Sequence, residues 1–156
     1  MITLQDLGNL GEILGAIGVI VSLLYLAVQV RQNTRSIRAS TYQAFSESFR
    51  DFRNLLLGDE RLGAVWGKGL RSRSELSETE RAQFDALLMN FLRGVEVSFY
   101  QQANGLLDED FYRGWIDEAL VIWSLPGPSD WWSENSQFFN REFRAVWERR
   151  LTCGRS

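Results

Sequence analysis

The sequence contains no histidine, one cysteine (Cys153) and one lysine (Lys68). Without histidine the chain lacks the commonest general base, the commonest metal ligand and the usual pH switch. A lone cysteine cannot form a disulfide within the chain, so the composition is compatible with a reducing cytosol. Zinc sites built from cysteine and histidine, and di-iron sites built from E-x-x-H repeats, are excluded in those forms.

Proline is also scarce, with two residues, and positive charge is not in excess: the formal net charge is −3. A nucleic-acid-binding protein needs a cationic face to neutralise phosphates, so we expect no nucleic-acid partner. The scarcity of turn residues and the spread of Ala, Leu, Glu and Arg favour helices over strands. We therefore predict an all-α fold, in which one N-terminal transmembrane helix continues into a small antiparallel helical bundle.

The transmembrane prediction depends on residues 13–30, ILGAIGVIVSLLYLAVQV, which carry no charge. As a helix they extend about 27 Å, close to the ~30 Å hydrocarbon core of a bilayer. A cleaved signal peptide is a poor alternative, because the preceding residues are acidic rather than basic. A buried helix of a soluble oligomer is the other alternative.

The flanks of this run predict its orientation. Acidic residues precede it, whereas Arg31, Arg35 and Arg38 follow it. By the positive-inside rule, we expect a single-pass protein of the bacterial inner membrane whose arginine side faces the cytoplasm. The expected order is a short extracytoplasmic N-terminus (1–12), the span (13–30), a cytoplasmic helical domain (31–152) and a flexible tail (153–156).

Small residues recur at helical spacing in this region, at Gly11, Gly15, Gly18 and Ser22. Spacings of four, three and four place them on one helix face, and small residues let two helices approach closely in lipid. We predict a helix-packing interface there, with another copy of the chain or another membrane protein. The alternative is that glycine is simply frequent in spanning helices.

Start and stop signals divide the rest of the chain into helices. Residues 31–57 continue the first helix until Gly58-Asp59, and a short, glycine-weakened helix is expected over residues 60–70. Ser77 and Glu80 form a capping-box pattern that begins a central core helix, which Asn104-Gly105 ends. Asp108 is the expected N-cap of the next helix, and Ser129 or Asp130 of a last helix that runs to Leu151.

Two pairs of side chains are candidate site residues. Arg93 and Glu96, three apart on the central helix, can pair with each other, which indicates a boundary salt bridge or, alternatively, a ligand-gripping pair. Trp131 and Trp132 are adjacent, so on a helix they point about 100° apart. We expect at least one of them to be exposed and to contact lipid or a partner.

The sequence carries no recognisable metal-binding or catalytic motif. The acids Asp108, Glu109 and Asp110 can be a hard-cation site, but clustered acids are more typical of a helix start. Near Lys68, GAVWGKGL lacks the spacing of a phosphate loop and its Ser or Thr. No Ser, Thr or Cys stands beside an evident base. We therefore expect a non-enzymatic protein without a metal or cofactor.

Three blocks, GAIGVIVSLLYLAVQVRQNTRSIRAS, GLLDEDFYRGW and FFNREFRAVW, together resemble an uncharacterised family of bacterial proteins with one N-terminal span and a helical cytoplasmic domain. The resemblance implies the same architecture here and implies no activity. Two functions remain open at this point. The first is a membrane-anchored interaction protein, as a scaffold or an accessory subunit, and the second is a membrane-tethered sensor that holds an apolar or lipid-like small molecule. A cavity among the core helices would favour the second.

Overall fold

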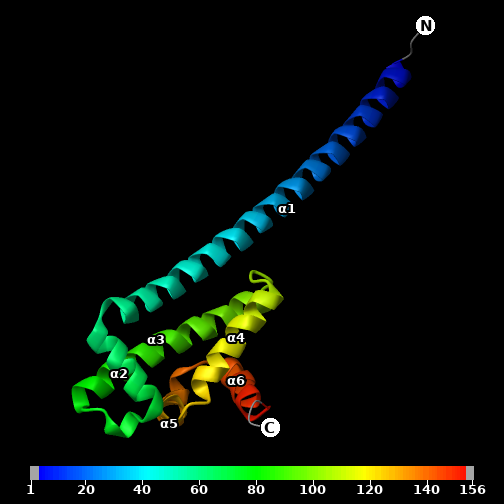
Figure 1. Cartoon of the computed structure of the whole chain (residues 1–156). Helices are drawn as coiled ribbons and strands as arrows, with labels where there is room; N and C mark the ends of the chain where they lie inside the picture. Colours follow the sequence, from blue (N-terminus) through cyan, green and yellow to red (C-terminus); the bar gives the residue numbers. More distant parts are fainter. Residues whose placement is uncertain (1–3, 154–156) are drawn as a thin grey trace. The chain divides into compact units, whose positions relative to one another are not determined.

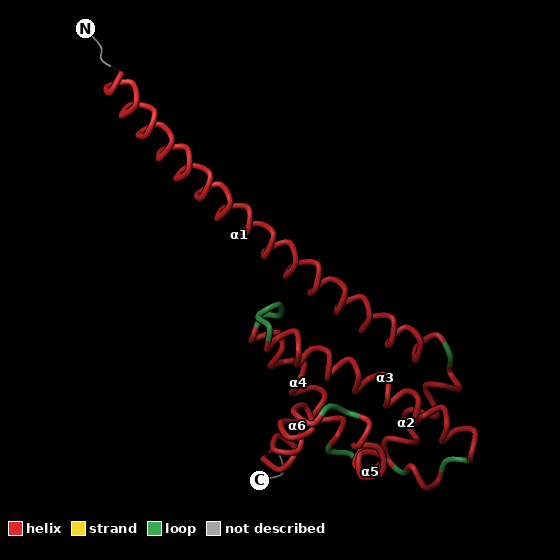
Figure 2. The backbone as a smooth tube through the Cα atoms, turned by 180° about the vertical axis from the view of Figure 1, so that it is seen from behind, coloured by secondary structure: helices red, strands yellow, loops and turns green. Residues whose placement is uncertain are grey.

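The structure is a computed structural model that describes residues 4–153, and within that range it contains helices and no strands. Figures 1 and 2 show a long first helix followed by shorter helices joined by short loops. This confirms the all-α prediction. The α-helices are α1 (Leu4–Gly58), α2 (Glu60–Arg71), α3 (Glu78–Ala103), α4 (Glu109–Trp123), α5 (Pro126–Asn135) and α6 (Arg141–Cys153), with 3₁₀ turns η1 (Arg73–Glu75) and η2 (Ser136–Phe138).

The chain divides into two compact units, one ending at Ser40 and one beginning at Thr41, and α1 contributes to both. The predicted start of a cytoplasmic domain at residue 31 concerns the membrane boundary and stays a prediction. Side chains of residues 31–40 are all exposed, whereas Thr41 and Phe45 are half-buried. Side-chain burial along this part of α1 thus begins at Thr41, the residue at which the second unit begins.

The first unit is the N-terminal part of α1, and its apolar stretch packs against no other described element. The part of α1 from Leu14 contains an 18-residue window with a mean hydropathy of 1.9, and none of that window is buried. Leu24, for example, is 63% exposed. A soluble protein would bury a helix of this kind, because exposed apolar surface is unfavourable in water. By length and composition this helix could span a membrane.

The second unit packs around α3, which contacts α2 and α4, while α5 contacts α2, η1 and α4, and α6 contacts α4. In Figures 1 and 2, α3 and α4 lie side by side. The core is unusually aromatic. Trp123 is fully buried at its centre and its ring contacts those of Phe91, Trp131 and Trp147. Large aromatic side chains fill the core because each buries more apolar surface than an aliphatic one.

The helix boundaries within this unit follow local chemistry. Asp59, directly after α1, accepts hydrogen bonds from the backbone N–H groups of Arg61 and Leu62 and so begins α2. Ser77 and Glu80 form the predicted capping box at the start of α3. Gly105 follows α3 with a φ of 68°, a conformation that favours glycine. The Gly58-Asp59 stop, the capping box, the Gly105 stop and the Asp108 N-cap of α4 are all confirmed.

The end of the chain differs from the prediction of one last helix. Helix α5 begins at Pro126, not at Ser129 or Asp130, because proline is favoured in the first turn of a helix. It ends at Asn135, and η2 then leads to a separate helix, α6. The break places Phe139 and Phe143 in the core while Phe138 is 56% exposed. Of the predicted tail, Cys153 belongs to α6 and residues 154–156 lie outside the described residues.

Glycines allow α2 and α5 to approach each other closely. A Cβ atom on Gly127 would lie 1.8 Å from the carbonyl oxygen of Gly69, and one on Gly69 would lie 2.4 Å from the ring of Phe84. Both distances are far inside van der Waals contact, so neither position has room for a side chain. Gly69, which weakens α2 as an isolated helix, is thus required by the packing of that helix.

Candidate functional site

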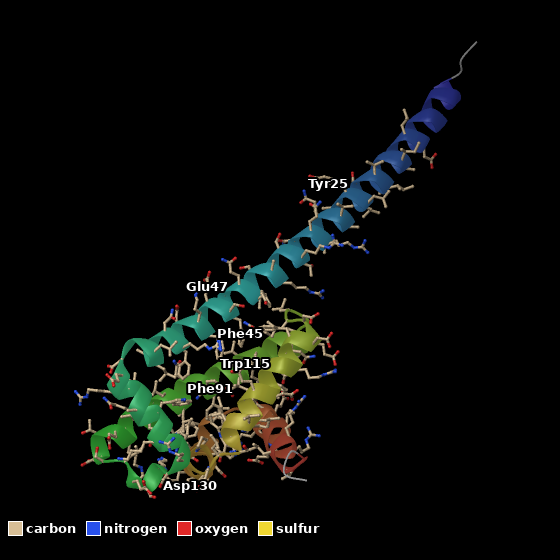
Figure 3. The ribbon with its side chains drawn as sticks, in the orientation of Figure 1. Tyr25, Phe45, Glu47, Phe91, Trp115 and Asp130 are labelled. Atoms are coloured by element: carbon tan, nitrogen blue, oxygen red, sulfur yellow. The ribbon has the colours of Figure 1, made fainter. Side chains whose placement is uncertain are left out.

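A groove of about 350 Å³ lies in the second unit, between the last turns of α1 and helix α3. Figure 3 shows Phe45 of α1, Phe91 of α3 and Trp115 of α4 gathered in this region. Its volume falls in the range of small-molecule sites, ~300–1,000 Å³. The lining consists of apolar and uncharged polar residues with one arginine: Ala44, Phe45, Ser48, Phe49, Phe52, Asn90, Phe91, Arg93, Gly94, Val97, Gln101 and Trp115.

The sequence makes this groove by alternating large and small residues along two helices. Phe45, Phe49 and Phe52 follow the four-and-three spacing of one helix face and are half-buried. The Phe49 ring meets Trp115 edge-on with centroids 4.4 Å apart, and Phe52 lies 5.6 Å from Phe91. Small residues line the space beside these contacts, and a Cβ atom on Gly94 of α3 would meet nothing within 4 Å. Aromatic rings thus join α1 to α3 and α4 and leave room beside them.

Several polar groups of the groove have no protein partner among the described residues. The Oε1 atom of Gln101 and the Nε1 atom of Trp115 are buried without a hydrogen bond. Ser48 and Asn90, which are exposed, make no side-chain hydrogen bond within the described part of the chain. Leaving a buried acceptor unpaired costs about 1–3 kcal/mol. Unpaired buried atoms also occur in the packed core, at the Nε1 atoms of Trp123 and Trp147, so it is their position beside the groove that distinguishes those of Gln101 and Trp115.

The predicted pairing of Arg93 with Glu96 is present, and both side chains also bond to the backbone between α5 and α6. The Arg93 guanidinium donates to Glu96 and to the carbonyl of Phe138, 2.7 Å away, and lies over the ring of Phe139. The other carboxylate oxygen of Glu96 accepts from the backbone N–H of Asn140 at 2.8 Å. The pair therefore holds the segment between α5 and α6 against α3. This structural task occupies both carboxylate oxygens of Glu96 and two of the five N–H donors of Arg93.

The expected exposure of Trp131 or Trp132 is wrong. Trp131 is 1% and Trp132 8% exposed, so neither offers a surface to lipid or to a partner. Trp131 packs edge-on against Trp123, and Trp132 packs against Phe139. The two indoles of α5 point in different directions, and each meets an aromatic ring of the core, so both are buried.

The small-residue face of Gly11, Gly15, Gly18 and Ser22 is open in the structure. A Cβ atom added to any of its three glycines would meet nothing within 4 Å among the described residues, and the Ser22 hydroxyl donates to the Gly18 carbonyl at 2.8 Å. The face is accessible, and association through it stays a prediction.

The acids at the start of α4 act as helix-capping groups. Asp108 accepts from the backbone N–H groups of Asp110 and Phe111, and Glu109 pairs with Arg113. Among the described residues, no group of three or more His, Cys, Asp and Glu side chains could hold a metal ion.

Sequence reasoning missed a buried ionic cluster around Arg73. This arginine is 5% exposed and donates two hydrogen bonds to Asp85, at 2.8 and 2.7 Å, and one to Glu134 at 2.8 Å. The hydrogen bonds to Asp85 raise the pKa of Arg73 further above its usual value, against the opposing effect of burial. The hydrogen bond from Arg73 lowers the pKa of Glu134. Because the partners come from η1, α3 and α5, no local spacing in the sequence could indicate the cluster.

Comparison with known proteins identified no relative: no family model, no curated protein and no solved structure matches this chain significantly. The groove, the exposed apolar helix and the ionic cluster are therefore interpreted from their own chemistry.

Proposed function

We propose that this chain is a non-enzymatic, membrane-anchored interaction protein, acting as a scaffold or as an accessory subunit of a membrane complex. One observation carries the proposal: the apolar part of α1 has a mean hydropathy of 1.9 and is wholly unburied. Lipid is the environment that makes such a helix stable, because it leaves no apolar surface in water. The open small-residue face supports association within the membrane.

The orientation belongs to the same proposal. Arg31, Arg35 and Arg38 follow the apolar run, so the helical domain faces the cytoplasm of the bacterial inner membrane and the N-terminus lies outside. This arrangement matches the uncharacterised single-span family that the sequence resembles.

A second candidate function is favoured by the groove. A tethered sensor or binding module needs a cavity among its core helices, and a groove of about 350 Å³ with unpaired polar groups lies where α1 joins α3 and α4. The two functions are compatible, since a ligand in this groove would contact the helix that enters the membrane.

The interaction function is tested by isolating the full-length protein from native membranes in mild detergent and measuring the native mass of what is recovered. We expect resistance to alkaline extraction, which removes peripheral proteins, and a stoichiometric partner or a defined homo-oligomer. A matched control replaces Ile20 and Val21, which are 57% and 59% exposed, with arginine. Charged residues at the centre of a span oppose insertion, so this variant should lose membrane retention. A monomer that is extracted at alkaline pH would contradict the proposal.

A further inference from the structure

We propose that the groove between α1 and α3 binds an uncharged amphipathic small molecule, with its apolar body on the aromatic side chains and a neutral hydrogen-bonding head at Gln101. The inference deepens the second candidate function above and rests on it. The groove is bounded by α1 residues 44–52 and α3 residues 90–101, with Trp115 of α4 at its floor.

The shape of the groove fits an elongated ligand. Phe52, near the end of α1, contacts Phe91, near the first lining residue of α3. Gln101 lies eleven residues after Asn90 on the same helix. At about 1.5 Å per residue, these two polar side chains start from backbone positions about 16 Å apart. Five aromatic side chains line the groove, which favours a ring or a short hydrocarbon body.

The charges around the groove favour a neutral ligand. Arg93 is the one charged side chain among the described residues that line it, and no carboxylate does. The Arg93 guanidinium is paired with Glu96 and also bound to the Phe138 carbonyl. An anionic ligand would have to compete with Glu96, and a cationic ligand would find no counter-charge. Both would lose hydration without full compensation.

The unpaired atoms specify the polar part of the ligand. The amide of Gln101 makes no hydrogen bond within the described residues, and because its Oε1 atom is buried, its Nε2 group is the part that a ligand in the groove can reach. The complementary group is therefore an uncharged acceptor, such as the oxygen of an alcohol, a phenol or an amide. At the other end, Asn90 is exposed and makes no side-chain hydrogen bond within the described residues, so it can bind a second polar atom or water.

The test uses full-length protein in lipid nanodiscs and two probes with the same body, 4-hexylphenol and 4-hexylbenzoate. At neutral pH the first is uncharged, with a phenol oxygen that can accept a hydrogen bond, whereas the second is an anion. Native mass spectrometry counts the molecules retained per chain, and empty nanodiscs correct for partition into lipid. We expect one 4-hexylphenol per chain, with an affinity at least about tenfold above that for 4-hexylbenzoate. Equal or tighter binding of the benzoate, or no retained phenol, would overturn the proposal.

Three variants locate the binding. Gly94→Leu places a side chain in the groove, where a Cβ meets nothing within 4 Å, and should abolish binding. Gly67→Leu is the matched control, because its Cβ is equally free and it does not line the groove. Gln101→Leu should lower affinity about tenfold while leaving the unfolding temperature of the ligand-free protein equal or higher, because it removes an unpaired acceptor. Binding that survives Gly94→Leu, or is lost equally in Gly67→Leu, contradicts the assignment.

Two further outcomes separate this inference from the functions above. If the wild-type chain is oligomeric in these spectra and the Gly94→Leu variant is monomeric, a second copy of the chain occupies the groove. The small-molecule proposal then fails. If the protein stays in the membrane but retains no probe, the anchoring proposal stands and only the ligand is wrong. Loss of membrane retention by the wild-type chain would instead refute the anchoring proposal, whatever the probes do.

Discussion

At the scale of single residues, Gly127 and Gly69 decide whether α2 and α5 can meet. Gly127→Ala would bring a methyl group to 1.8 Å from the Gly69 carbonyl oxygen, which is backbone and cannot move aside. We expect a loss of about 3 kcal/mol or more in the free energy of unfolding, at the upper end of overpacking effects. Denaturant unfolding of the full-length protein in nanodiscs measures this loss.

The control for that variant is Gly67→Ala in α2, where an added Cβ meets nothing within 4 Å. Alanine is the better helix former, so this change should be neutral or raise the free energy of unfolding by up to about 1 kcal/mol. An equal loss of unfolding free energy in Gly127→Ala and Gly67→Ala would contradict the view that Gly127 is needed for the close approach of α2 and α5.

Arg73 is the second residue whose replacement should be costly. Arg73→Met leaves Asp85 and Glu134 without their buried partner, although their side chains are 30% and 54% exposed and partly solvated. Breaking buried pairs costs about 3–5 kcal/mol, and solvent screening reduces this to about 2 kcal/mol here. Arg81→Met, which removes an exposed partner of the same Glu134, should cost less than about 0.5 kcal/mol. The two unfolding curves test the contrast directly.

The same cluster predicts an acid-sensitive contribution to stability. The pKa of Glu134 is lowered in the folded protein, chiefly by the hydrogen bond from Arg73, so the folded state favours the carboxylate. Its stabilising effect is fully present above the ordinary pKa of a glutamate and is lost as the pH falls through the lowered folded pKa. Glu134→Gln should therefore flatten the decline in unfolding temperature below about pH 5. A decline of unchanged steepness in the variant would exclude Glu134 as its source.

At the scale of elements, α1 combines two kinds of surface. Residues up to Ser40 are exposed on every described face, whereas Phe45, Phe49 and Phe52 attach the last turns to α3 and α4 through ring contacts. The half-buried face of α1 begins at Thr41, whereas Ile37, which helical spacing places on the same face, is 46% exposed. Periodicity identifies a face and cannot say what covers it.

The small-residue face of α1 gives an element-scale prediction. Gly15→Leu adds bulk where a Cβ now meets nothing, so the helix itself should be unaffected. If two helices pack through this face, the change should reduce association in the membrane by about tenfold while leaving insertion intact. Cross-linking in native membranes measures association. Ala16→Leu, one position along the helix and off the predicted face, is the matched control, and equal effects of the two changes would exclude the face.

At the scale of the whole molecule, the proposed orientation can be measured with a single thiol. Leu57 is 83% exposed in the helical domain, so Leu57→Cys in a Cys153→Ser background presents one accessible label site. If the domain is cytoplasmic, a membrane-impermeant maleimide should label this site only after the inner membrane is permeabilised. Labelling of intact spheroplasts would mean that the helical domain lies outside the cytoplasm, and it would contradict the positive-inside argument.

The sequence by itself determined the helical class, the apolar N-terminal helix and most helix boundaries, including the Ser77–Glu80 capping box and the turn at Gly105. These features depend on composition, hydropathy and hydrogen bonds between near neighbours, which a linear pattern contains. The tertiary structure alone decided that Trp131 and Trp132 are buried, that Arg73 gathers carboxylates from two helices, and that α5 and α6 are separate. The groove also depends on the tertiary structure, because it lies where side chains from distant segments of the chain pack without filling the space between them.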